Sequence, residues 1–287
     1  MQIIHTVAEL RQALSKQANV VFVPTMGNLH AGHIQLVNVA KQHSECVVVS
    51  IFVNPLQFGP TEDLASYPRT LEADCEKLKA AGASIVFSPS VEEMYPQMTE
   101  SKSDGTNLNQ TMTITPPPIA SELCGANRPG HFSGVATVVM KLFNIVQPTI
   151  AVFGQKDFQQ LFIIKQMVKQ FNLPIDIIGV DTVREPSGLA MSSRNGYLTE
   201  AQRAAASQLN SALQSIVNSV KTGNKDYSQL ELQAKNKLTE QGWLADYISI
   251  RSSLTLTPAT SVDSQLVVLG AAKLGNTRLI DNLAFNL

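Results

Sequence analysis

P-T-M-G-N-L-H-A-G-H, residues 24–33, joins a short apolar segment to a segment with helical spacing. Residues 19–23 before it are apolar and mostly β-branched, which is typical of a buried parallel strand. Residues 34–41 after it have the apolar spacing of a helix packed on that strand. The decapeptide therefore predicts a turn from a strand into a helix.

Two histidines stand at the start of the predicted helix. His30 and His33 are three residues apart, so their side chains can share one helix face. Gly27 and Gly32 allow the backbone to approach a ligand closely. Because a helix N-terminus favours anionic groups, the segment fits a phosphate site. A glycine-rich turn with two surface histidines fits the same residues and stays open as the alternative.

Composition and charge limit the class of protein. The 287 residues allow one large domain or two smaller ones, and 44% hydrophobic residues allow a sizeable core. A formal net charge of −1 gives no global electrostatic reason to bind nucleic acid or an anionic membrane. The three cysteines are widely spaced, as free thiols in a reducing compartment would be. With no apolar run of membrane-spanning length and no signal peptide at the N-terminus, we expect a cytoplasmic protein.

Further apolar segments predict a parallel sheet. Strands are expected at 19–23, 45–53, 84–87, 149–153 and 175–180. Helices are expected at 7–16, 34–41, 67–81, 135–146 and 158–171. Crossovers of this length suit parallel pairing, so the expected fold is an α/β, Rossmann-like doubly wound sheet. Such sheets bind ligands beyond the carboxyl ends of their strands, where residues 24–33 lie.

The pattern changes in two places. Residues 97–118 are polar and predict a surface segment, either a passive loop or one that covers the site. After residue 184, long helices are expected at 199–222 and 227–241, followed by short strands at 247–251, 265–269 and 277–282. Helices followed by strands are typical of an α+β module. We therefore predict one domain at 1–184 and a smaller C-terminal α+β domain at 185–287.

Polar side chains gather after the predicted strands, whereas the P-loop, G-x-G-x-x-G, nucleophile-elbow and H-E-x-x-H motifs are absent from the sequence. The set comprises His30, His33, Asn54, Gln57, Arg128, His131, Lys156, Asp157, Gln160, Ser192, Ser193 and Arg194. Lysine and arginine suit phosphate oxygens, and neutral amides suit hydroxyl or carboxylate groups. Each residue alone could instead cap a helix or hold a turn. Together they fit direct attack between bound substrates on a polyphosphate.

Six segments occur in the order of the motifs of a known family. They are P-T-M-G-N-L-H-A-G-H (24–33), F-V-N-P-L-Q-F-G (52–59), Y-P-R-T-L (67–71), R-P-G-H-F-S-G-V-A-T-V-V (128–139), F-G-Q-K-D (153–157) and M-S-S-R-N-G-Y-L (191–198). In these motifs the chain resembles the pantothenate synthetases (pantoate–β-alanine ligases), within the wider superfamily of HIGH-motif nucleotidylyl transferases. A transferase that activates another small acid or phosphate ester, and a non-catalytic nucleotide-binding module, are the alternatives.

The resemblance implies a reaction in two steps. The pantoate carboxylate attacks the α-phosphate of ATP to give pantoyl adenylate and pyrophosphate, and the β-alanine amine then expels AMP. The resemblance also implies a place in pantothenate and coenzyme A synthesis and a homodimer whose ligands are ATP, pantoate and β-alanine. Mg²⁺ would accompany ATP, with no tightly bound organic cofactor.

Residue roles follow from the resemblance, motif by motif. The ATP-binding residues would be Met26, Gly27, Asn28, Leu29, His30, Ala31, Gly32, His33, Gly154, Gln155, Lys156, Asp157, Val183, Met191, Ser192, Ser193 and Arg194. The catalytic residues among them would be His33 as proton donor, His30, Lys156 and Arg194. Gln57 and Gln160 would bind pantoate, Gln57 would also lie near β-alanine, and Asp74 is the candidate metal ligand. The domain at 185–287 would act as a lid.

Overall fold

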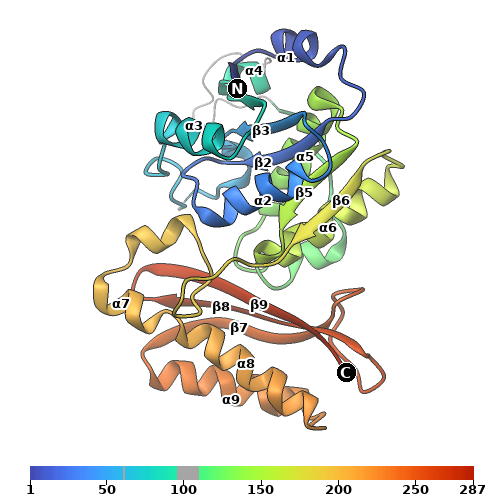
Figure 1. Ribbon diagram of the computed structural model, residues 1–287. Helices are drawn as coiled ribbons and strands as arrows, with labels where there is room; N and C mark the ends of the chain where they lie inside the picture. The colour runs from blue at the N-terminus through green and yellow to red at the C-terminus, as the bar shows by residue number, and fades with distance from the viewer. Residues whose placement is uncertain (61, 96–109) are drawn as a thin grey trace.

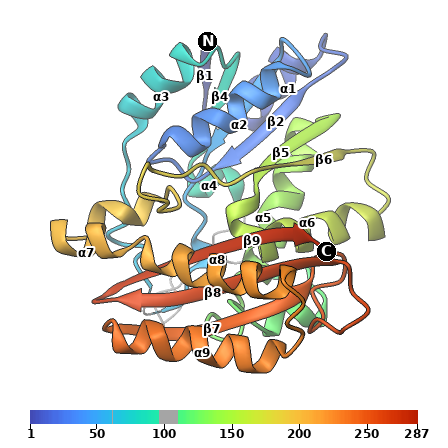
Figure 2. The same cartoon turned by 60° about the horizontal axis from the view of Figure 1, so that its bottom comes forward.

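The computed structural model describes residues 1–60, 62–95 and 110–287. Its N-terminal part contains a six-stranded sheet in which every pairing is parallel (Figures 1 and 2). The strands are β1 (Gln2–Ile4), β2 (Val21–Thr25), β3 (Val47–Ile51), β4 (Ile85–Phe87), β5 (Ile150–Gly154) and β6 (Asp176–Val180). Their order is β1-β4-β3-β2-β5-β6, so the winding reverses between β2 and β5. A parallel sheet binds ligands at this switch point.

Helices cover both faces of this sheet, which confirms the predicted doubly wound fold. The longer ones are α1 (Val7–Leu14), α2 (Ala31–Lys41), α3 (Leu71–Ala80), α5 (His131–Val146) and α6 (Phe158–Gln170). Phe22 and Val48 point into a core with α1, α5 and α6, whereas Val23 and Val49 point into a core with α2 and α3. Because both faces are buried, the central strands β2, β3 and β5 are mostly apolar.

The short elements of this part shape the strand ends. They are α4 (Val91–Met94) and the 3₁₀ turns η1 (Pro55–Gln57), η2 (Pro118–Ser121) and η3 (Gln155–Asp157). Gly134 lets α5 pack against η1, because a Cβ at this position would lie 2.2 Å from the Leu56 carbonyl oxygen. The close approach places Gln57 of η1 beside the N-terminal half of α5.

The C-terminal part is the expected α+β module. Its elements are η4 (Ser193–Tyr197), α7 (Glu200–Ala205), α8 (Gln208–Lys221), α9 (Tyr227–Glu240), β7 (Trp243–Ser252), β8 (Gln265–Leu274) and β9 (Thr277–Asn286). The strands form an antiparallel sheet in the order β7-β8-β9. One face packs on α8 and α9, and Val267 and Leu269 on the other face pack toward Phe158 of α6 (Figure 1). The sheet is thus covered on two sides.

Several predicted boundaries were wrong. The single helix predicted at 199–222 is two helices, because the chain tightens at Ala206, whose N–H donates to Arg203 O three residues back. The helix predicted at 67–81 begins only at Leu71, after Pro68, which disfavours helical backbone in the residue before it. The C-terminal strands have ten residues each, about twice the predicted length. The three-residue edge strand β1 and helix α4 were not predicted.

Two expectations concern other parts of the chain. Of the polar segment at 97–118, residues 97–109 lie outside the described residues, and the structure assigns no strand to residues 110–117. No helix within residues 1–60, 62–95 and 110–287 is long and apolar enough to cross a membrane.

Candidate active site

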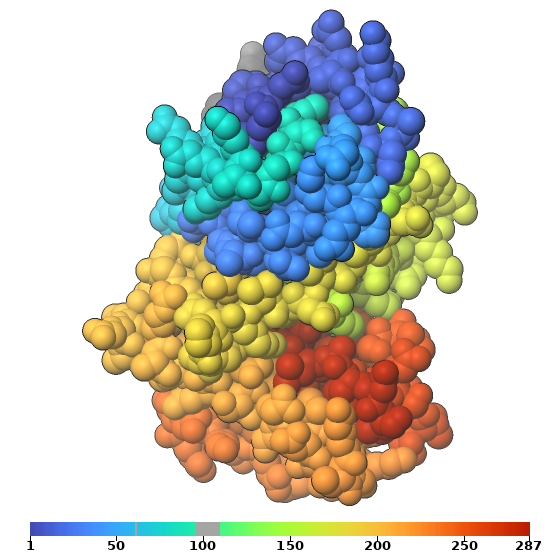
Figure 3. Space-filling model, in the orientation of Figure 1, coloured from blue at the N-terminus to red at the C-terminus, as the bar shows by residue number. Residues whose placement is uncertain are grey.

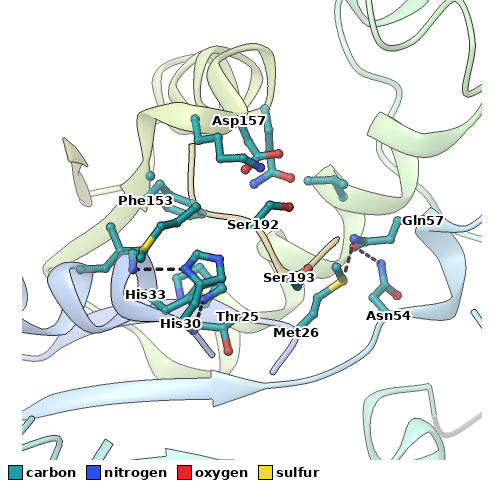
Figure 4. A pocket seen from close by; sticks show the side chains of 18 of the residues that line it. Thr25, Met26, His30, His33, Asn54, Gln57, Phe153, Asp157, Ser192 and Ser193 are labelled. Atoms are coloured by element: carbon teal, nitrogen blue, oxygen red, sulfur yellow. Dashed lines mark hydrogen bonds between the residues drawn. The ribbon is translucent and has the colours of Figure 1, made fainter. Parts of the chain in front are cut away.

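A cavity of about 230 Å³ lies at the carboxyl ends of β2, β3 and β5 (Figure 4). Most of the residues predicted for the site form part of its wall: Met26, His30, Gly32, His33, Gln57, Gly154, Lys156, Asp157, Gln160, Val183, Met191, Ser192, Ser193 and Arg194. These residues come from segments up to 168 positions apart, from Met26 to Arg194. The structure therefore brings together the strand ends that the sequence indicated.

Five residues predicted to bind ATP are not part of this wall: Gly27, Asn28, Leu29, Ala31 and Gln155. Gly27 and Asn28 have φ angles of 82° and 49°, so they form the bend of the turn. The Leu29 side chain is buried in the core with α2 and α3. The Gln155 amide donates to Gly179 O of β6. These residues therefore fix the backbone of the segments, and the side chains next to them in sequence line the cavity.

Asp74 holds the backbone of the turn that precedes α2, on the side away from the cavity. Its side chain is fully buried, and its two oxygens accept hydrogen bonds from the backbone N–H groups of Asn28 and Leu29, each at 2.8 Å. Thr70 Oγ1 donates to it at 3.0 Å, and Lys77 Nζ lies 3.8 Å away. Asp74 is also not part of the cavity wall. The structure therefore speaks against the predicted metal-ligand role, because this carboxylate is committed to the turn.

His30 and His33 begin α2 and interact through the helix backbone. Gly32 N–H donates to His30 Nδ1 at 3.1 Å, and His30 N–H donates to His33 Nδ1 at 3.3 Å. An Nδ1 atom that accepts a hydrogen bond carries no proton, so each neutral ring holds its hydrogen on Nε2. The two rings lie 4.1 Å apart, and both side chains line the cavity (Figure 4). The pair can therefore offer two Nε2–H donors to a ligand.

The surroundings keep both rings neutral. Burial lowers the pKa of His33 to about 3, with further lowering by the neighbouring His30 and Lys156. Burial and the charge of Lys156 lower the pKa of His30 to about 4, although Asp157 acts in the opposite direction. In the ligand-free protein at pH 7 the two histidines are uncharged hydrogen-bond donors.

The buried neutral His33 should make stability depend on pH. Unfolded histidine binds a proton near pH 6.5, whereas folded His33 resists it until about pH 3, so acid favours the unfolded chain. His33 alone should lower the free energy of unfolding by about 2 kcal/mol between pH 6.5 and 5. Urea titrations at the two pH values should show a smaller fall in a His33→Asn variant. The same substitution at exposed His43 is the control, and an equal fall in all three proteins would contradict the assignment.

Gln57 has a fixed amide orientation at the other end of the cavity. Asn54 Nδ2 donates to Gln57 Oε1 at 3.1 Å and to Gly134 O at 3.2 Å. Asn54 Oδ1 accepts from Tyr95 OH at 2.7 Å, and burial raises the pKa of Tyr95, so this hydroxyl remains a donor. Gln57 Nε2 therefore faces Met26 Sδ and the cavity (Figure 4). The cavity is offered N–H donors, which suit a carboxylate or hydroxyl oxygen.

An arginine and a lysine side chain also line the cavity. Lys156 lies on η3 after β5, and Arg194 lies on η4 after β6. Arg194 Nη2 is 3.3 Å from Asp63 Oδ1, on the segment between η1 and α3. This ion pair joins the C-terminal segment to the N-terminal part of the molecule. In the space-filling view the yellow segment near residue 190 forms a band between the two parts (Figure 3).

Arg128 and His131 lie behind Gln57 and do not line this cavity. Arg128 pairs with Glu62 at 2.6 Å, and its Nη1 lies 2.9 Å from His131 Nε2. His131 Nδ1 donates to Gln57 O at 2.8 Å, and burial, together with the charge of Arg128, lowers the pKa of His131 to about 4. These two residues hold η1 in place and line a smaller neighbouring cavity with Lys156.

A family model described as Pantoate-beta-alanine ligase matches residues 2–284. The chain belongs to the pantoate–β-alanine ligase family. A pantothenate synthetase of Methylobacillus flagellatus is 63% identical over 100% of this chain and 99% of that protein. One from Neisseria meningitidis serogroup C is 51% identical, and the match covers 100% of each.

Solved structures of pantoate–β-alanine ligases resemble the whole chain. The pantothenate synthetase of Thermus thermophilus has a TM-score of 0.90 and 42% identity, covering 99% of both chains. The pantoate-β-alanine ligase of Francisella tularensis has a TM-score of 0.80 and 36% identity, covering 99% of this chain and 97% of that one. That crystal structure contains β-γ ATP and β-alanine.

The site residues predicted from the sequence did not include the apolar side chains of the cavity wall. One face of α5 supplies Val135, Val138, Val139 and Leu142, spaced at i, i+3, i+4 and i+7. The same spacing occurs on any helix packed in a core, so the sequence could not mark this face as a binding surface. Asn54, Tyr67, Asp181 and Thr182 also belong to the wall. The sequence marks Asn54 as a polar residue after a strand and predicts no specific role for it.

Proposed function

We propose that this protein condenses pantoate with β-alanine, using ATP, through a pantoyl-adenylate intermediate. Family membership over the whole chain supports the overall reaction, as do the ligands of the Francisella tularensis structure. The observation that carries the proposal is the cavity at the switch point. Within it, the phosphate-type donors of His30, His33 and Lys156 share one space with the fixed amide of Gln57.

The first step joins pantoate to the nucleotide. A pantoate carboxylate oxygen bonds to the α-phosphorus of ATP, the bond from that phosphorus to the bridging oxygen breaks, and pyrophosphate leaves. Gln57 Nε2–H and the Gln160 amide hold pantoate, and the apolar face of α5 packs against its branched hydrocarbon part. Holding the two reactants in one cavity replaces a collision in solution with attack inside the complex.

The phosphate groups lie on the side of the histidines. His30 and His33 donate through Nε2–H, and Lys156 and Arg194 supply positive charge as negative charge builds up on the leaving pyrophosphate. An anionic triphosphate favours the protonated form of a nearby imidazole, so the pKa of His33 rises when ATP binds. This shift supports the proton-donor role proposed for His33, whose Nε2 is the ring nitrogen that can face the phosphates, because Nδ1 accepts a hydrogen bond from the His30 N–H. Asp157 lies toward the ribose and Val183 toward the adenine.

The second step forms the amide bond. The β-alanine amine attacks the acyl carbon, the bond between that carbon and the phosphate oxygen breaks, and AMP leaves. Water must be kept from the acyl phosphate meanwhile. We assign the substrate-binding domain to residues 1–184 and the lid to residues 185–287, with Met191–Arg194 closing on the phosphates. The position of Arg194 in the cavity wall, bonded to Asp63, supports this division.

Mg²⁺ is proposed as the cation that accompanies ATP. In the part of the chain that the structure describes, no group of three or more His, Cys, Asp or Glu side chains could hold a metal ion. The donors in the cavity suit phosphate oxygens better than a cation, and magnesium commonly binds through substrate phosphates and water. We therefore assign the ion to ATP and derive no step through it. A homodimer is proposed from the family resemblance alone, and a cytoplasmic location from the three widely spaced cysteines.

A turnover assay with each substrate omitted in turn tests the function. Pyrophosphate release should require ATP and pantoate, whereas AMP release at the full rate should also require β-alanine. Phosphate-coupled detection of pyrophosphate and chromatography of AMP provide the two measurements. Rapid pyrophosphate release without pantoate would instead support a nucleotidylyl transferase acting on another acid, and ATP binding without turnover would support a non-catalytic module.

A further inference from the structure

Two adjacent polar residues of β9 are buried where the C-terminal sheet meets the nucleotide side of the cavity. Asp281 is 4% exposed and Asn282 is 6% exposed. A buried carboxylate is costly unless it is paired. Arg184 provides the partner through two hydrogen bonds, from Nη1 at 2.7 Å and from Nη2 at 2.9 Å, and Asn210 of α8 donates a third at 3.1 Å.

Asn282 contacts the turn that carries Lys156. Its Nδ2 group donates to the carbonyl oxygens of both Gln155 and Lys156, each at 2.9 Å. One NH₂ group has two hydrogens, so each carbonyl can take one of them. Fixing two successive peptide units fixes the backbone on both sides of the Lys156 Cα, and with it the direction in which the side chain leaves η3.

The same pair of residues also holds the segment after β6. Arg184 follows Val183, which lines the cavity, and Arg184 Nη2 additionally donates to Asn282 O at 3.3 Å. Asp281 and Asn282 therefore connect two strand ends, β5 and β6, to one point on the C-terminal sheet. Both strand ends lie on the side of the cavity assigned to the nucleotide.

We propose that Asn282 is a positioning residue for Lys156: its bonds to the Gln155 and Lys156 carbonyls aim the lysine at the ATP phosphates. The proposal rests on the phosphate role of Lys156 given under the proposed function. Asn282 acts through the turn, because the phosphates interact with the lysine side chain. The C-terminal part then contributes to the ATP site in two ways. It closes over the phosphates, and its sheet positions Lys156 through Asn282.

The test compares Asn282→Ala with Asn210→Ala. Asn210 belongs to the same network, but its amide bonds to Asp281 and not to the Lys156 turn, so its variant is the matched control. We expect Asn282→Ala to lower pantoate-dependent pyrophosphate release about 10- to 100-fold, with weaker ATP binding by calorimetry and unchanged pantoate affinity. Asn210→Ala should stay near the wild type in all three measurements.

A double-mutant cycle with Lys156→Ala separates positioning from general damage. Adding Asn282→Ala to Lys156→Ala should change neither the rate nor the ATP affinity further, because the lysine being positioned is gone. An equal loss in both backgrounds, an equal loss in Asn210→Ala, or wild-type behaviour of Asn282→Ala would overturn the proposal. If the alanine variant does not fold, the nearly isosteric Asn282→Asp takes its place in the cycle. Wild-type protein that releases no pyrophosphate would count against the proposed function instead. The positioning role of Asn282 would then be tested by the ATP affinities of the variants alone.

Discussion

Replacing His33 with alanine should slow pantoyl-adenylate formation about 10²- to 10³-fold, which is the effect of removing one well-placed donor to developing negative charge. The ring is anchored at Nδ1 by the His30 N–H, so its Nε2–H has a fixed direction into the cavity. Such a donor lowers the energy of the transition state more than that of bound ATP. The Kd for ATP should therefore change far less than the rate.

Single-turnover measurement of adenylate formation, with enzyme in excess over ATP, provides the rate without β-alanine. His43→Ala is the control, because His43 is an exposed histidine after the end of the same helix. Thermal unfolding shows whether the loss of the backbone contact at the helix start has destabilised the protein. A near-normal single-turnover rate in His33→Ala would remove His33 from the phosphate chemistry.

The sheet could be predicted because the signal for a buried parallel strand lies within the strand's own sequence. A parallel strand covered on both faces must be nearly continuously apolar, and residues 46–53, in which Ser50 is the one polar residue, come close to this without reference to any other part of the chain. The position of the site followed from the same argument, since parallel strands end at one edge. In contrast, β1 was missed because a three-residue edge strand with an exposed Ile3 has no such pattern.

The roles of individual polar residues depend on contacts between distant segments. Asp74 and Asn28 are 46 positions apart, and only the fold shows that the carboxylate holds the turn and does not face the cavity. Arg184 and Asp281 are 97 positions apart, and no sequence pattern pairs them. A motif marks which segment approaches a ligand, but it does not tell side chains that contact the ligand from those that hold the backbone. Gln155 and Lys156 are neighbours that differ in this way.

The second large effect is expected at Gln57. In Gln57→Glu, the side chain keeps its shape, and one oxygen can still accept from Asn54 Nδ2. The other oxygen then replaces the Nε2–H donor that faces the cavity, so pantoate loses a hydrogen bond to its charged group and meets a like charge. A hydrogen bond to a charged group contributes about 1.5–3 kcal/mol, and repulsion adds to its loss, so pantoate affinity should fall roughly 10²- to 10³-fold.

The affinity for ATP should stay close to that of the wild type in Gln57→Glu, because the two histidines lie on the other side of the cavity (Figure 4). Calorimetry with pantoate and with ATP separates the two ligands. Gln155→Glu is the matched control: it makes the same chemical change at a side chain that bonds to Gly179 O outside the cavity wall. Acid should partly restore pantoate binding in Gln57→Glu, since a protonated carboxyl group is neutral and can donate again. Unchanged pantoate affinity would mean that the amide held by Asn54 and Tyr95 faces a different ligand.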